Sequence, residues 1–261
     1  MFSPATPAFS PLLPGGDPAV SSLASGRSGN SPEIAEADGT GCSRDWLLWQ
    51  LADSAFPTGG FAHSAGLEAA WQLGEVRMAG ELAAFLEASL GQCVHGSVPF
   101  MNAAFQAPDR WPELDALCEA FVTNHVANRA SRLQGQALVH SAERIFGFPA
   151  FESGREPPER ALRKHLAPAL GVLTRWLGLT RIEAVRLFLF LHLRGLLAAA
   201  VRLGIAGPYQ AQSIQHALGV QLEQLIMKGA ALSLEDAAQV SPLLDLWQAT
   251  HDRLYSRLFQ S

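Results

Sequence analysis

Residues 46–73 read WLLWQLADSAFPTGGFAHSAGLEAAWQL, and this stretch predicts a helix, a glycine-containing turn and a second helix. The first apolar run stops at the pair Asp53 and Ser54, whose side chains favour turns because they bond to their own backbone. Pro57 cannot continue a helix, and the pair Gly59 and Gly60 permits a tight reversal at positive φ. The apolar members of the second predicted helix are Phe61, Leu67, Ala70 and Trp71.

The composition of the whole chain favours an all-α protein. The 261 residues are 48% hydrophobic, which is enough for a sizeable buried core. Leu and Ala dominate over the β-branched residues that strands prefer. The formal net charge is -5 without a basic block, so no nucleic-acid partner is expected. We predict a single-domain bundle of about ten helices.

The first 44 residues differ from the rest of the chain. Residues 1–44 contain 6 Pro, 6 Gly and 8 Ser and show almost no periodicity, which predicts a disordered leader before an all-helical domain over 45–253. No basic region followed by an apolar run precedes the domain, so no secretory signal is expected. Three scattered cysteines do not form a disulfide framework and fit a reducing, cytoplasmic setting.

Residues 185–206 are apolar enough to raise the question of a membrane span. Four basic side chains interrupt this run, and each charge near a bilayer centre costs roughly 2.5 to 3.5 kcal/mol. We therefore predict a buried core helix and no membrane association. The interrupting residues are Arg186, His192, Arg194 and Arg202.

Capping residues, glycines and prolines divide the rest of the domain into further helices. Thr180 and Glu183 form a capping box that opens an apolar, central helix. Gly135 lies inside a long helical pattern, where glycine costs about 1 kcal/mol against Ala, so we expect another helix to pack closely there. The predicted helices cover 81–95, 99–106, 112–124, 125–146, 181–203, 208–218, a segment ending near 229 and, after a cap at 233–236, 243–255. One or two further short helices are predicted in 160–178, broken at Pro168. The inner stripe of the helix over 125–146 comprises Val126, Ala130, Leu133 and Ala137.

Catalytic and metal-binding motifs are weak. Residues 62–66, AHSAG, resemble the serine-hydrolase elbow G-x-S-x-G, but Ala62 replaces the first glycine and no strand precedes it, so a structural role for Ser64 is favoured over a hydrolase. The eight histidines form no H-x-x-x-H pair, and the closest metal pattern is Cys93-Val94-His95. No P-loop is present. We expect no enzyme, no metal site and no bound cofactor.

Two further segments are candidate partner surfaces. A polar face of the helix over 125–146 is either a solvated face or a contact for a partner protein; it comprises Asn128, Arg129, Arg132 and Gln136.

The chain ends with apolar side chains where ends are normally polar. Burial of Leu254, Tyr255, Leu258 and Phe259 contributes very roughly 6 to 12 kcal/mol, whereas ordering about eight residues costs on the order of 8 to 16. We predict that residues 254–261 are mobile alone and become ordered on a partner. The alternative is a segment docked on its own domain.

Three motifs, in this order, resemble the UreF-type urease accessory proteins. Residues 53–68 are similar to the family's N-terminal signature, residues 128–138 to its pattern of an arginine and a small residue before Gln-Gly, and residues 250–261 to its Arg-Leu-Phe-x-Ser ending. His63 is a departure, because many members have tyrosine there.

The resemblance implies an all-helical, homodimeric adaptor in the assembly of the nickel site of urease. Such an adaptor joins a UreD/UreH-type protein and a UreG-type GTPase to apo-urease, so nickel and GTP are handled by its partners. The resemblance suggests that the C-terminal segment orders against the UreD/UreH-type protein and that residues 59–61 face the GTPase. The alternatives are a helical scaffold unrelated to urease, or a hydrolase that uses Ser64. The candidate contact residues are Gly59, Gly60, Phe61, His63, Arg129, Arg132, Tyr255, Arg257, Leu258 and Phe259.

Overall fold

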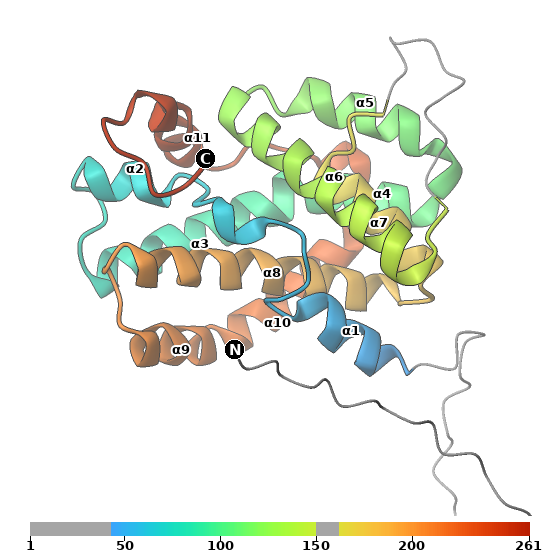
Figure 1. Cartoon of the computed structure of the whole chain (residues 1–261), viewed down its shortest axis with the longest axis horizontal. Coiled ribbons are helices and arrows are strands. Elements are labelled where there is room, and N and C mark those ends of the chain that lie inside the picture. Colours follow the sequence, from blue (N-terminus) through green and yellow to red (C-terminus); the bar gives the residue numbers. More distant parts are fainter. Residues whose placement is uncertain (1–42, 150–161) are drawn as a thin grey trace, which may run out of the picture. The chain divides into compact units, whose positions relative to one another are not determined.

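The helix α8 (Arg181–Arg202) lies at the centre of the packing (Figure 1). It contacts α1, α2, α3, α4, α7, α9, α10 and the 3-10 turn η1. The structure is a computed structural model that describes residues 43–149 and 162–261, all within the compact unit Ala37–Ser261. Residues 1–42 of the predicted leader and most of the loop after residue 147 lie outside the described residues. Ser43 caps α1 and Arg44 begins it, so the helical domain starts slightly before the predicted residue 45.

The described residues contain helices and no strand, which confirms the all-α prediction. The elements are α1 (Arg44–Ala52), η1 (Gly60–Ala62), α2 (Leu67–Gln72), α3 (Ala79–Gly96), α4 (Val98–Gln106), η2 (Pro108–Arg110), α5 (Trp111–Phe121), α6 (His125–Phe146), α7 (Leu166–Trp176), α8, α9 (Pro208–Ala217), α10 (Gly219–Ala231), η4 (Leu234–Asp236), α11 (Pro242–Thr250) and η5 (His251–Arg253).

The predicted capping box starts α8. The Thr180 hydroxyl accepts from the Glu183 amide at 3.3 Å, and the Glu183 carboxylate accepts from the Thr180 amide at 2.6 Å. In the most apolar stretch of 18 residues in α8, 56% of the stretch is buried inside the protein. The helix is long and apolar enough to cross a membrane, yet this burial is what a core helix requires.

Gly135 marks a close approach, as predicted, and the neighbour is the start of α7. A methyl group at Gly135 would overlap the carbonyl oxygen of Lys164 and lie 2.8 Å from the carbonyl carbon of His165. The buried Asp115 carboxylate fixes the same segment by accepting the amide protons of residues 163–165 at 2.5 to 3.0 Å. The helices α6 and α7 therefore meet backbone to backbone.

Some helix predictions were wrong in detail. Pro168 does not break a helix, because it lies in the first turn of α7, where the amide has no intrahelical acceptor in any case. The last helix ends at Thr250 instead of Tyr255. Leu133 is 44% exposed and does not belong to the inner face of α6, which buries Leu138 and Val139. Phe61 belongs to η1 and precedes α2, and its side chain is exposed.

Candidate functional site

The turn around η1 creates a receptor for a second segment of chain. Gly59 is left-handed at φ 70° and opens η1, and Gly66 at φ 90° opens α2. Between them, the Ala62 carbonyl accepts from the Gln260 amide at 2.8 Å, and the Ser64 amide donates to the Ser261 backbone oxygen at 2.6 Å. The chain from residue 254 onward therefore lies along η1 and the loop that follows it.

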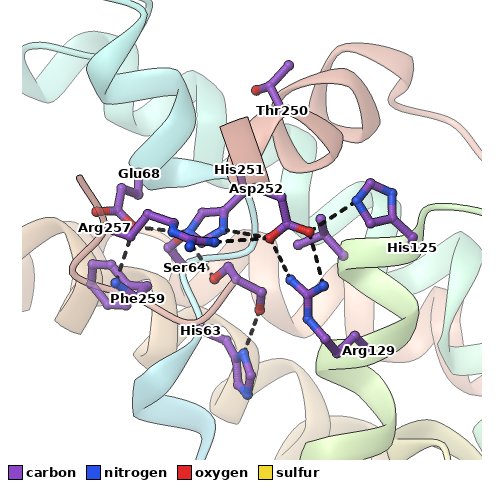
Figure 2. A network of polar contacts seen from close by, with 12 residues as sticks. His63, Ser64, Glu68, His125, Arg129, Thr250, His251, Asp252, Arg257 and Phe259 are labelled. Carbon is purple, nitrogen blue, oxygen red and sulfur yellow. Dashed lines mark hydrogen bonds and ion pairs between the residues drawn. The ribbon is translucent and has the colours of Figure 1, made fainter. Parts of the chain in front are cut away.

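Glu68, in the first turn of α2, anchors this segment (Figure 2). The carboxylate is 1% exposed, and it accepts the amide protons of Leu258 at 2.6 Å and Phe259 at 3.2 Å. His251 Nε2 lies 3.1 Å from the same carboxylate, and the His251 ring is fully buried. Because a carboxylate only accepts, this nitrogen carries the proton.

Asp252 connects the same segment to α6. Its carboxylate accepts from both Arg129 Nη atoms at 3.0 and 2.8 Å and lies 3.2 Å from His125 Nε2 and 3.3 Å from Arg257 Nη1. The hydrogen bonds from Arg129 are the largest cause that lowers the pKa of Asp252 to about 2, and charge from Arg129 and His125 adds to them. Figure 2 shows that the side chains of Arg129, His125 and Arg257 converge on one carboxylate.

His63 and Ser64 lie on the other side of the segment. His63 Nδ1 is 2.5 Å from the Ser261 hydroxyl, and the Ser64 hydroxyl donates to the Ser261 backbone oxygen at 3.2 Å. Burial, followed by the nearby charges of Arg129 and His251, lowers the pKa of His63 to about 4. The ring is therefore neutral near pH 7. The Ser64 side chain is fully buried, which leaves no open path to its hydroxyl.

Arg202, at the end of α8, joins the two segments. Its guanidinium donates to the Phe61 carbonyl at 2.6 Å and to the Leu258 carbonyl at 3.3 Å, and it lies 4.2 Å from the centroid of the Phe259 ring. Phe259 is buried, whereas Phe61 is 71% and Leu258 60% exposed. The backbone is therefore held at both Phe61 and Leu258, while the apolar side chains of these two residues lie in solvent.

The structure corrects the prediction that residues 254–261 are mobile, and the alternative of a segment docked on its own domain holds. The prediction counted four buried apolar side chains, but only Phe259 is buried, and Tyr255 is fully exposed. Hydrogen bonds to Glu68, Ala62 and Ser64 supply the missing stabilisation. Docking of a partner on this segment stays a prediction.

Most of the predicted contact residues lie together, and one does not. Arg129, Arg257 and His63 join the network around the C-terminal segment, with the turn at Gly59 and Gly60 beside it. Arg132 points elsewhere, with its Nη1 3.7 Å from Glu119, beside the buried His165.

The polar face of α6 forms hydrogen bonds and ion pairs with other parts of the same chain. The sequence predicts either a solvated face or a contact for a partner protein, and neither prediction includes this role. Asn128 donates to the Val122 carbonyl at 3.2 Å and Gln136 to the Arg163 carbonyl at 3.4 Å. Together with the ion pairs of Arg129 and Arg132, these bonds use the face to connect neighbouring elements.

Sequence reasoning missed the residues that hold the segment. Their long-range contacts join residues that are 56 to 191 positions apart, and the one available signal was a charged residue, Glu68, among apolar neighbours in a helix. The missed residues are Glu68, His125, Arg202, His251 and Asp252. Among the described residues, no group of three or more His, Cys, Asp or Glu side chains is placed to hold a metal ion.

The fold and site define an all-helical protein whose C-terminal segment forms an ordered surface. The model of the UreF family matches residues 76–219. Urease accessory protein F of Arabidopsis thaliana is 38% identical over 221 residues, 83% of this chain and 92% of that protein. The protein of the same name from Oryza sativa subsp. indica is 37% identical over 219 residues, 82% of this chain and 84% of that protein. A UreF-like urease accessory protein of Schizosaccharomyces pombe is 32% identical over 225 residues, 81% of this chain and 94% of that protein. The chain belongs to the UreF family.

Proposed function

We propose that this protein is an adaptor in the assembly of the nickel site of urease. In this role it joins a UreD/UreH-type protein and a UreG-type GTPase to apo-urease as an assembly chaperone, and it acts as a homodimer in the cytoplasm. The similarity to proteins named urease accessory protein F supports the involvement with urease. Nickel and GTP are handled by the partners, and this chain binds neither directly.

The observation that carries the proposal is the fixed C-terminal segment with its apolar side chains in solvent. Tyr255, Leu258 and Phe61 are exposed. Glu68 and Arg202 hold the backbone of Leu258, and Arg202 also holds that of Phe61. Fixed apolar side chains favour docking because little conformational entropy is lost when a partner covers them. This surface is the docking site for the UreD/UreH-type protein, and the adjoining turn at residues 59–61 faces the GTPase.

The first test is light scattering on size-exclusion peaks of this chain alone and mixed with the UreD/UreH-type protein from the same source. We expect a dimer that shifts to a stoichiometric complex. A monomer that does not shift in the presence of a folded partner would refute the adaptor role.

A second experiment locates the docking site. Combined Tyr255→Ala and Leu258→Ala substitutions remove exposed side chains without disturbing the core, so we expect the complex to be lost while the fold is retained. Ile145→Ala is the matched control, because Ile145 is 45% exposed but lies about 24 Å along α6 from Arg129. Arg257→Ala with Phe259→Ala should also abolish urease activation, since it removes a contact to Asp252 and the buried anchor of the segment.

The hydrolase alternative has no supporting observation. The Ser64 hydroxyl is buried and donates to Ser261, and no strand precedes it in the part of the chain that the structure describes. A nucleophile elbow instead exposes its serine on a turn between a strand and a helix.

A further inference from the structure

Glu68 is a buried carboxylate whose partners come from the far end of the chain. It accepts from the amides of Leu258 and Phe259 and lies within hydrogen-bond distance of His251, and these residues are 183 to 191 positions away in the sequence. Burial of a carboxylate is costly unless donors compensate it. The described structure supplies three donors, two backbone amides of the C-terminal segment and the His251 ring of η5.

The identity of the bonded atoms matters, because two of the donors are consecutive backbone amides. The side chains that follow these two amides differ sharply in burial. A carboxylate that holds both amides therefore sets the register of the segment: Phe259 enters the core, and Leu258 stays 60% exposed. A slip of one residue would place Leu258 or Gln260, depending on its direction, in the buried position of Phe259.

A second contact depends on the same register. Arg202 donates to the carbonyl oxygens of Phe61 and Leu258, so these two exposed side chains are borne by backbone tied to one guanidinium. This arrangement requires Leu258 to be the residue whose amide binds Glu68 Oε1.

We propose that Glu68 is a positioning residue for partner recognition: it fixes the register of the C-terminal segment and so presents Leu258 and Tyr255 in the orientation that a partner protein reads. This inference rests on the proposed adaptor function. Glu68 itself is buried and does not touch the partner.

The experiment compares Glu68→Gln with the matched control Asp115→Asn in the full-length chain. Asp115 is also 1% exposed and also accepts consecutive backbone amides, but it holds residues 163–165 at the start of α7. Each substitution turns one carboxylate oxygen into an NH2 donor that opposes a donor already in place. The two variants therefore carry the same kind of defect at different sites.

The readouts are amide hydrogen exchange and the dissociation constant for the UreD/UreH-type protein. For Glu68→Gln we expect exchange at residues 258–260 to rise about tenfold or more, and the dissociation constant to rise by a similar factor. For Asp115→Asn we expect faster exchange at residues 163–165 and an unchanged dissociation constant. If Glu68→Gln does not fold, Glu68→Asp, which keeps the charge and shortens the reach, serves for both readouts.

The outcomes separate this inference from the proposed function. Unchanged exchange at residues 258–260, or faster exchange with undiminished binding, overturns the positioning role and leaves the adaptor role intact. Equal losses of binding in both carboxylate variants also overturn it, because the effect then follows from general destabilisation. If the wild-type chain binds no partner, the adaptor role fails, and the exchange comparison alone decides whether Glu68 fixes the segment.

Discussion

Gly135 is the position where a single methyl group should do the most damage to this fold. In an open helix, Gly→Ala is stabilising by about 0.5 to 1 kcal/mol. At Gly135 the added Cβ would overlap the Lys164 carbonyl oxygen and lie 2.8 Å from both the His165 carbonyl carbon and the Leu166 nitrogen. These are backbone atoms, so no side-chain rotation relieves the overlap.

The neighbouring backbone also has little freedom to move. Asp115 accepts three of its amide protons, and the buried His165 side chain is bonded to Glu119 and Ser131. Overpacking of a core typically costs about 1 to 3 kcal/mol, and a pinned backbone places this site at the upper end. We therefore expect Gly135→Ala to lower the free energy of unfolding by about 2 to 3 kcal/mol, which lowers the melting temperature by about 4 to 12 °C.

The assay is thermal unfolding followed by circular dichroism, with Gly91→Ala as the control. Gly91 lies inside α3, and a Cβ there would have no atom within 4 Å, so this variant should melt slightly above the wild type. The reasoning is refuted if Gly135→Ala melts at or above the wild-type temperature while Gly91→Ala behaves as expected.

Three further predictions follow from buried or capping side chains. Burial lowers the pKa of His63 and of His192 to about 4, whereas in the unfolded chain these side chains bind a proton near pH 6.5. The stability to urea should therefore fall as the pH decreases from about 6.5 to about 4. His192→Gln removes one of the two groups and should make this fall less steep. Ser64 should not react with a fluorophosphonate probe, because its hydroxyl is buried, and labelling would revive the hydrolase alternative. Asn124→Ala should destabilise the protein by about 1 to 2 kcal/mol in denaturant titrations, since its side chain caps α6 and also donates to Asp245; an unchanged midpoint would contradict this role.

Helix boundaries were predictable wherever the chain carries a local signal. The prediction of a helix over 125–146 matches α6 because Asn124 caps its first turn and Gly147 adopts the left-handed conformation at its end. The last helix has no such signal after Thr250, and its apolar pattern continues through Leu254 and Tyr255, so the prediction extended it too far. Tertiary contacts of His251 end the helix instead.

The candidate site was predictable in its location but not in its construction. The glycine turn and the apolar chain end are local features, and the structure brings them together. The carboxylates that join them are not local features, because the pairing of Glu68 with Leu258 or of Arg129 with Asp252 depends on how distant helices pack. One sequence without relatives carries no signal for such pairs.

The docked C-terminal segment shows why a balance of apolar burial against chain entropy was insufficient. That balance left the segment marginal even with four side chains counted as buried, yet Tyr255 and Leu258 are in solvent. The segment is fixed because acceptors provided by η1 and α2 meet its amides, and because Asp252 is paired with the positive charges of Arg129 and Arg257 and lies beside the His125 ring. Burial of Tyr255 and Leu258 contributes little to holding the segment, so their apolar area remains available to a partner. This division, in which polar contacts hold the backbone and apolar side chains are left free, supports the proposal that a partner recognises this surface.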